Sequence, residues 1–286
     1  MGRRIIGFTI AALLLSASFL QAGRFETMHF SFTPEEDIEN LEVRIDLGAG
    51  EFQLAVEKMD EVAVADAEYD ERRIEVYADY DEHGKTGVVE FRSECRRNFN
   101  IDTEDNIWDI ILSDKYPTEL EIDIGACEAE FDLGGLPLEF LDLDVGAADA
   151  EISFGKPNPI EAEEIMIDAG AADFRLKKLG NANFRRLTFD GGVGDFELDF
   201  SGEYKGMSRV DIDIGMGSAT LYIPRDLPVR IEADDSFLSS VDFDNAPRKF
   251  LEDDDYYETD DFDDADYGLD IEVSVGLGSV DIIFED

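Results

Sequence analysis

The sequence predicts an all-β chain folded as a stacked β-solenoid with 21–24-residue repeats. Three observations lead to this prediction: a short phrase that recurs along the chain, the spacing of its copies, and the alternation of apolar and polar residues within each copy. A fixed period of roughly 20–50 residues is typical of solenoids, in which each coil buries its apolar face only by stacking on its neighbours. Alternation with a period of two indicates strands and not helices.

The recurring phrase is anchored on a glycine, and its copies are centred on Gly48, Gly125, Gly146, Gly170, Gly192, Gly215 and Gly276. Two residues earlier an aspartate stands in six copies, with Ser274 as the exception: Asp46, Asp123, Asp144, Asp168, Asp190 and Asp213. Two residues later the side chain is always small: Gly50, Cys127, Ala148, Ala172, Gly194, Gly217 and Gly278. Six residues later it is always apolar: Leu54, Phe131, Ile152, Leu176, Leu198, Leu221 and Ile282.

The copies between Gly125 and Gly215 are separated by 21, 24, 22 and 23 residues. We expect each glycine at a corner of the coil, where the backbone needs a positive φ or approaches the next coil closely. The apolar position six residues later is predicted to point into the core. An antiparallel β-sandwich made of many short hairpins is the alternative fold.

Residues 1–22 are predicted to be a secretory signal peptide. Arg3 and Arg4 precede an apolar run from Ile5 to Leu20, and a small residue, Ala22, offers a cleavage point. The run is short for a membrane span, although retention as an uncleaved anchor is the alternative. Cleavage after Ala22 would leave 286 − 22 = 264 residues and change the net charge from −46 to −46 − 2 = −48.

The rest of the chain divides into two parts. Residues 23–119 are predicted to form irregular β rungs, since the 77 residues from Gly48 to Gly125 leave room for three coils or for a hairpin that turns near Gly84. Residues 120–286 are predicted to form the regular solenoid repeats. Within them the segment 252–266, in which ten of fifteen residues are acidic, is predicted to be a solvated acidic loop.

The charge excludes two classes of partner. The chain has 24 Lys and Arg against 70 Asp and Glu, a net charge of −46, which argues against binding to nucleic acid or to an anionic membrane surface. A hydrophobic content of 44% is too high for a disordered acidic tail. The sequence therefore predicts a folded, strongly acidic protein.

Stacking would place the acidic residues of the phrase in rows. One row is formed by the aspartates before the glycines, and a second by the acidic residues three positions after them: Glu51, Glu128, Asp149, Asp173 and Asp195. Strands about 4.8 Å apart would bring these like charges close together, and bound Ca²⁺ could bridge them. We expect a solvated outer face with at most a weak association with Ca²⁺, because the phrase differs from the calcium-binding nonapeptide repeat. No metal ligand is therefore assigned.

No catalytic or cofactor-binding residue is assigned either, and no cofactor is expected. His29 and His83 are far apart in sequence, and none of the Gly-x-Gly phrases opens a helix. Cys95 and Cys127 are the only thiols; a disulfide between them is one alternative, and two reduced, buried thiols are favoured. Trp108 is the only tryptophan, and we expect it to pack in the core.

Several segments resemble bacterial toast-rack domains, which are related to the cell-wall-active antibiotic response proteins and to adhesin domains of unknown function. The resemblance is carried by the segments 107–113, 116–120, 125–127, 132–136 and 275–280, and it covers about residues 40–286. It implies a β-solenoid in the bacterial cell envelope, and it implies no catalytic residue. Relatives in stress-response signalling carry membrane helices, whereas this sequence shows only the N-terminal signal.

These observations lead to two functional hypotheses. The favoured one is a non-catalytic secreted or envelope protein, located in the periplasm, at the cell surface or outside the cell, that serves as an interaction or surface module. Its partner, an envelope protein or a surface polymer, is not identified by the sequence. The alternative is an enzyme or carrier that acts on an extracellular polymer. A deep cleft with convergent side chains would favour the alternative, and a flat charged wall would favour the first hypothesis.

Overall fold

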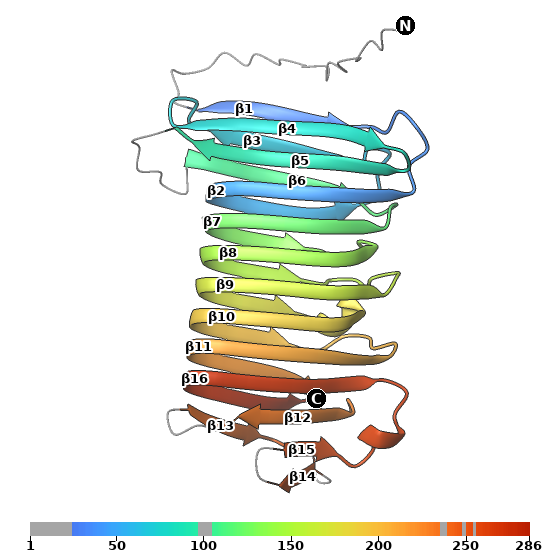
Figure 1. Cartoon of the computed structure of the whole chain (residues 1–286), viewed down its shortest axis with the longest axis vertical. Coiled ribbons are helices and arrows are strands. Elements are labelled where there is room, and N and C mark those ends of the chain that lie inside the picture. Colours follow the sequence, from blue (N-terminus) through green and yellow to red (C-terminus); the bar gives the residue numbers. More distant parts are fainter. Residues whose placement is uncertain (1–24, 97–104, 235–238, 248–249, 254–255) are drawn as a thin grey trace, which may run out of the picture.

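The computed structural model of the chain describes residues 25–96, 105–234, 239–247, 250–253 and 256–286. These residues form one tall stack of strands that run across its long axis (Figure 1). The regular structure is almost entirely β, as predicted, and the described residues include no helix with the length and apolar character needed to cross a membrane. The predicted signal peptide, residues 1–22, lies outside the described residues.

The described strands are of two kinds. Long strands of 15–18 residues build the middle of the stack: β2 (Asn40–Glu57), β7 (Thr118–Asp132), β8 (Leu138–Ser153), β9 (Ala162–Lys177), β10 (Phe184–Asp199), β11 (Met207–Pro224) and β16 (Gly268–Glu285). Shorter strands close the N-terminal end: β1 (Glu26–Phe32), β3 (Ala63–Tyr69), β4 (Ile74–His83), β5 (Thr86–Cys95) and β6 (Asn106–Ser113). The C-terminal end is closed by β12 (Val229–Asp234), β13 (Ser239–Asp244), β14 (Phe250–Asp253) and β15 (Tyr256–Thr259). The described 3₁₀ helices are η2 (Leu179–Ala182) and η3 (Phe262–Asp264).

Each long strand bends at its repeat glycine, so that it contributes to both walls of the stack (Figure 1). In β7, Gly125 and Ala126 at the bend both face solvent, which shifts the alternation of buried and exposed residues by one position. Since successive side chains point to opposite faces of a strand, this shift keeps the apolar residues inside after the chain has turned. Alternate positions are therefore buried on both sides of the bend: Leu120, Ile122, Ile124, Cys127, Ala129 and Phe131.

The long strands pair in parallel and in register, in the order β2-β7-β8-β9-β10-β11-β16. The phrase residues consequently lie above one another, and the stacked β-solenoid is confirmed. The antiparallel β-sandwich is excluded by the parallel pairing of the middle strands. The chain does not enter the stack in sequence order at its ends, because β16 lies between β11 and the earlier strands β12 and β13.

Large apolar side chains from both walls fill the space between them. The rings of Phe174, Phe189 and Phe196 contact one another in series, with centroid distances of 5.8 and 5.4 Å. The apolar residues six positions after the repeat glycines are at most 3% exposed, so their predicted inward direction is confirmed: Leu54, Phe131, Ile152, Leu176, Leu198, Leu221 and Ile282. The interior is thus a packed core along the length of the stack.

The repeat glycines form a column because neighbouring coils approach closely there. A Cβ on Gly146 would lie 2.6 Å from the carbonyl oxygen of Gly125, and one on Gly215 would lie 2.7 Å from that of Gly192, closer than real Cβ atoms come to other atoms. The positive φ that we also considered occurs two residues later, as at Gly217 with a φ of 138°. Close approach therefore requires glycine at the repeat position, whereas a positive φ requires it two residues later only in some coils, such as that of Gly217, and alanine or cysteine takes that place in others.

At the N-terminal end two separate strands replace one regular coil. β5 pairs with the first half of β2 and β6 with the second half, and the antiparallel strands β4, β3 and β1 continue the sheet beyond them. The interval from Gly48 to Gly125 therefore holds one divided coil and additional antiparallel strands, and not three coils. The hairpin that we considered is present as β4 and β5, which turn at Gly84 with a φ of 72°.

The C-terminal end has the same design, and it corrects the prediction of an acidic loop over residues 252–266. β12 and β13 divide a coil between them beside β16, and β15 and β14 extend the sheet from β12. The acidic segment thus includes β15 and η3, in which Thr259 and Phe262 are buried. Its charge is partly balanced by Arg230 of β12, which forms ion pairs with Glu258 and Asp263.

Candidate functional site

The bends of the long strands line up along one edge of the stack, which we call the bent edge, and the loops between coils lie along the opposite edge (Figure 1). At the bent edge each coil presents the same positions of the phrase to solvent. Three rows of side chains result, formed by the residues two before, one after and three after the repeat glycine. Because the strands pair in register, equivalent residues lie side by side on neighbouring strands, and each row extends along the stack.

The middle row follows the glycines directly and changes in character along the stack. It is alanine in the first four coils and larger in the last three: Ala49, Ala126, Ala147, Ala171, Val193, Met216 and Leu277. Val193 lies opposite Met216, and Met216 lies opposite Leu277, on neighbouring strands. These side chains are 53%, 47% and 41% exposed and are prominent among the exposed large apolar side chains of the described residues. We call these three side chains the apolar crest.

Sequence reasoning missed the apolar crest. It treated the position after the glycine as unspecified, because alanine, valine, methionine and leucine share no feature that a β-strand or a tight corner demands. Comparison of the seven copies at that position shows the change from alanine to larger apolar side chains. The sequence does not show that these side chains are exposed, because an apolar residue in an alternating strand is normally expected to be buried.

The predicted row of aspartates is present on one side of the crest. The aspartates pair one to one along the stack in the order Asp46, Asp123, Asp144, Asp168, Asp190 and Asp213. Partial burial raises the pKa of Asp123, and the adjacent Asp144 and Asp46 raise it further. The pKa of Asp190 is raised in the same way, by partial burial and then by Asp168 and Asp213.

Few cations offset this row. At its N-terminal end the guanidinium of Arg92 lies 4.0 Å from the carboxylate of Asp46. At its C-terminal end, where the phrase has serine in place of aspartate, the hydroxyl of Ser274 donates a hydrogen bond to Asp213 at 3.1 Å. Between these ends the carboxylates face one another across neighbouring strands, and like charges in directly opposed positions destabilise a sheet.

The second predicted acidic row lies on the other side of the crest. Glu51, Glu128, Asp149, Asp173 and Asp195 pair in that order along the stack. The row is relieved by Arg175, which lies 3.3 Å from Asp149, and it ends where Ser218 bonds to Asp195 at 2.5 Å. The bent edge is therefore an exposed row of small and apolar side chains between two rows of carboxylates.

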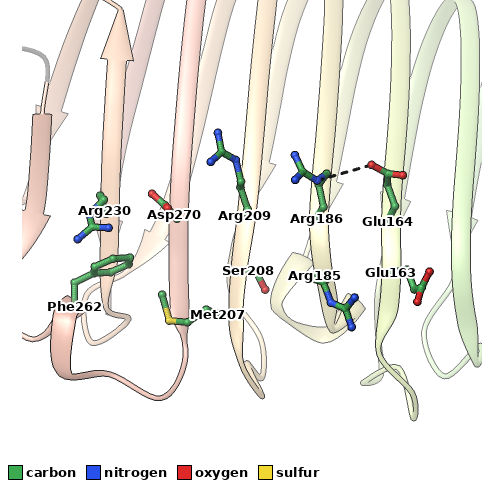
Figure 2. Close-up of a pocket in the computed structure, with 10 residues that line it drawn as sticks. All are labelled: Glu163, Glu164, Arg185, Arg186, Met207, Ser208, Arg209, Arg230, Phe262 and Asp270. Carbon is green, nitrogen blue, oxygen red and sulfur yellow. Dashed lines mark ion pairs between the residues drawn. The ribbon is translucent and has the colours of Figure 1, made fainter.

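A second surface feature is a shallow groove of ≈ 540 Å³ near the C-terminal end of one wall, where four of the sixteen arginines gather (Figure 2). Its cations are Arg185, Arg186, Arg209 and Arg230, which come from β10, β11 and β12. Figure 2 shows the guanidinium of Arg230 beside the ring of Phe262, and its central carbon lies 4.2 Å from the ring centroid. Such a contact holds the guanidinium in place.

The guanidinium groups of this groove are already paired with carboxylates of the same chain. Arg185 lies 3.0 Å from Glu161, and Arg186 lies 3.1 Å from Asp211. Arg209 lies 2.8 Å from Glu272. Since Arg230 is also paired, with Glu258 and Asp263, the groove is not a ready-made site for an anion.

The carboxylate rows form no cluster that could hold a metal ion, and the two histidines lie on different strands. Among the described residues no group of three or more His, Cys, Asp and Glu side chains is arranged to hold a metal ion. His29 lies in an exposed pair with Asp66 at 2.8 Å. His83 ends β4, in another strand.

The thiols and the tryptophan have structural positions. Cys95 and Cys127 are both unbonded; Cys127 is buried as expected, whereas Cys95 is exposed. Burial raises the pKa of Cys127 to about 12, so this thiol stays protonated at neutral pH. Trp108 is fully buried, which confirms its predicted core position, and its indole donates a hydrogen bond to the side-chain oxygen of Asn106 at 2.9 Å.

Two family models match the chain. Residues 21–162 match the N-terminal domain of toast_rack (DUF2154), and residues 173–282 match the C-terminal domain of the cell wall-active antibiotics response protein LiaF. The fold and these two descriptions indicate a surface or signalling module. The chain belongs to the toast-rack family.

Solved structures of low sequence identity are similar over nearly the whole chain. A candidate cell adhesion protein from Clostridium sporogenes is 19% identical, with a TM-score of 0.47, and the match covers 91% of this chain and 100% of that one. A candidate adhesin from Bacteroides fragilis is 10% identical, with a TM-score of 0.39 and coverage of 90% and 96%. A candidate lipid binding protein from Parabacteroides distasonis is 12% identical, with a TM-score of 0.33 and coverage of 91% and 97%. No curated protein matches the chain.

Proposed function

We propose that the protein is a non-catalytic module of the bacterial cell envelope, exported by its N-terminal segment, whose outer surface binds another envelope component. The observation that carries the proposal is the distribution of chemistry over the stack. The space between the walls is filled by apolar side chains, while the polar and charged groups stand outside in rows with one residue per coil. Rows of this kind suit an extended partner better than a small molecule, because a small molecule is normally bound in a pocket that encloses it.

The family assignment supports the same proposal. One of the two matching models is named for a cell-wall response, and the chain's own N-terminal segment has the basic start and short apolar run of a secretory signal. The net charge of −46 further favours a partner that is neutral or basic on its binding surface.

The alternative of an enzyme or carrier acting on an extracellular polymer receives less support. Its strongest feature is the groove that contains Arg209 and Arg230, because an anionic polymer requires cations. Both side chains already form ion pairs within the chain, so the cations that an anionic polymer would need are taken up by the protein's own carboxylates. We therefore give this groove no catalytic role.

Cell fractionation tests the proposed function. The chain is expressed with a C-terminal tag in a bacterial host, and the tagged protein is recovered from the cytoplasm, membrane, periplasm and medium. We expect it outside the cytoplasm, with N-terminal sequencing that begins near Gly23. Recovery of protein that begins at Met1 from the cytoplasm would contradict export. A membrane-bound form that retains residues 1–22 would support the envelope location and replace cleavage by anchoring.

A further inference from the structure

We propose that the bent edge is a docking surface for a basic amphipathic helix of a protein partner, with the apolar crest against the apolar strip of that helix. This inference rests on the proposed function and names the surface and the kind of partner. The starting observation is the exposure of Val193, Met216 and Leu277 in one continuous row. A row of exposed apolar side chains bordered by polar residues is typical of protein interaction sites.

The fold does not need large apolar side chains at the crest positions. In the first four coils the same position is alanine, and those coils bend and stack in the same register. The corner therefore does not require a large side chain there. Valine, methionine and leucine at the outermost point of a turn place apolar surface in water, which is unfavourable unless a partner covers it.

The charges beside the crest define the partner. Asp190 and Asp213 stand on one side of the crest, and Asp195 stands on the other, all of them exposed. A partner that covers the crest must present basic groups on both flanks of its apolar strip, since like charges across an interface are strongly unfavourable. This requirement argues against a second copy of the chain, which would bring the same carboxylate rows face to face. It also argues against an anionic membrane.

The spacing of the coils favours a helix. Neighbouring coils are about 4.8 Å apart, and a helix rises about 5.4 Å per turn. A helix that lies along the bent edge would therefore place roughly one apolar side chain on each coil. Its flanking lysines and arginines would lie over Asp190 and Asp213 on one side and over Asp195 on the other, because side chains three and four residues apart share a face of a helix.

Binding of a synthetic peptide tests this proposal with the mature protein. The probe is an 18-residue helical peptide of leucine and lysine, patterned to form one apolar strip between two basic flanks. A peptide with the same composition in scrambled order is the control for simple charge attraction. We expect the patterned peptide to bind at least about tenfold more tightly than the scrambled one at 0.15 M salt, as measured by fluorescence anisotropy.

Two sets of variants separate the apolar and the charged contributions. The crest variant V193S/M216S/L277S should weaken binding of the patterned peptide about tenfold and leave the salt dependence of the dissociation constant unchanged. The carboxylate variant D190N/D213N/D195N, which neutralises the acidic groups beside the crest, should reduce that salt dependence. The control variant Y77S/M207S/Y267S removes three exposed apolar side chains from elsewhere on the surface, and we expect it to change binding less than twofold.

Three results would overturn the proposal. Equal binding of patterned and scrambled peptides would show charge attraction alone. Equal loss of affinity in the crest and control variants would show unspecific apolar contact. Dimerisation of the wild-type chain in analytical ultracentrifugation that the crest variant abolishes would identify a second copy as the occupant. Each of these results would leave export and the envelope location, tested by fractionation, untouched.

Discussion

The middle of the stack and its two ends are held together by different means. In the middle, each coil repeats the same phrase, and stability comes from apolar positions and close-packed glycines that recur in every long strand. At the ends, the phrase is lost, and the last coil is divided between two strands. There, aromatic contacts between the two walls and partly buried ion pairs complete the structure.

The two ends show what those contacts are. At the N-terminal end Phe32 of β1 stacks on Tyr80 of β4 with a centroid distance of 5.9 Å, so aromatic rings from opposite walls close the core. At the C-terminal end Phe243 of β13 and Tyr257 of β15 do the same at 4.0 Å. A solenoid needs such terminal caps, because an open end would expose both its core and the unpaired edge of its sheet.

The ion pairs at the two ends are also less exposed than those of the long strands, such as Arg175–Asp149 and Arg209–Glu272. Arg73 near the N-terminal end pairs with both Asp70 and Asp105, and Arg230 at the C-terminal end pairs with Glu258 and Asp263. The aspartate row of the middle has few such partners. Partly buried ion pairs therefore help to hold the irregular coils, where the phrase is lost, whereas the repeated apolar and glycine positions hold the regular ones.

The largest expected effect is at the N-terminal end, for Trp108→Ala. The fully buried indole packs against Phe91 at 5.9 Å and Phe30 at 6.1 Å, so its removal leaves a large cavity and costs about 3–5 kcal/mol of unfolding free energy. Urea denaturation followed by circular dichroism measures this loss. Trp108→Phe should cost less, because it keeps most of the volume and loses the hydrogen bond to Asn106. Equal losses for the two variants would contradict the packing argument.

A single methyl group in the glycine column tests the middle of the stack. We expect Gly146→Ala to lower the unfolding free energy by about 1–3 kcal/mol, because its Cβ meets the backbone of Gly125 and the coils must separate. Gly206→Ala is the matched control, since a Cβ at that glycine meets no atom within 4 Å and φ does not lie in the left-handed region. If thermal denaturation gives the same shift for both variants, close approach does not explain the column.

Salt should stabilise the middle more than the ends. Raising the ionic strength from 0.01 M to 1 M shortens the Debye length from about 30 Å to about 3 Å, which screens the repulsion within the aspartate rows. We expect the melting temperature to rise by a few degrees in sodium chloride, with the increase reduced in D144N/D168N. Calcium chloride at the same ionic strength should give an equal shift. A large additional shift at low millimolar calcium would instead reveal specific sites.

The smallest expected effect is that of Asp123→Asn, which should stabilise the protein by about 0.2–1 kcal/mol at pH 7. The pKa of Asp123 is raised in the folded state, so its ionised form lowers stability at every pH above that raised value. The advantage of the variant should therefore be complete at pH 7. It should disappear as the pH falls through the raised pKa to below the usual value of 3.8. A stabilisation that persists at pH 3 would contradict this electrostatic origin.

The middle of the fold was predictable from sequence because the same phrase occurs seven times, so each position can be compared across seven copies. The column at Gly125 and Gly146, the inward Phe131 and the aspartate rows follow from repetition and from the alternation of strands. The ends were not predictable in this way. Tyr80 and Phe32 are 48 residues apart, and nothing local indicates that β1 and β4 meet across the core.

The candidate functional surface and the charged C-terminal end were predictable only in part. The carboxylate rows follow from the phrase, but the acidic segment that contains Glu258 was mistaken for a loop because its partner, Arg230, lies 28 residues away. The apolar crest was missed because sequence alone does not separate an apolar residue at an exposed corner from one in the core. Exposure is set by the bend, and the bend becomes visible only when the coils are stacked.

The proposed binding of a partner along the bent edge is open to a direct test. Site-specific photocrosslinking in the native envelope tests it directly, with benzoylphenylalanine placed at Met216 on the crest and, as the control, at the exposed Lys156 on the loop edge. We predict adducts from position 216 whose crosslinked peptide, identified by mass spectrometry, lies in a basic amphipathic segment of another protein. Adducts that form equally from position 156, or that join two copies of this chain, would contradict the claim.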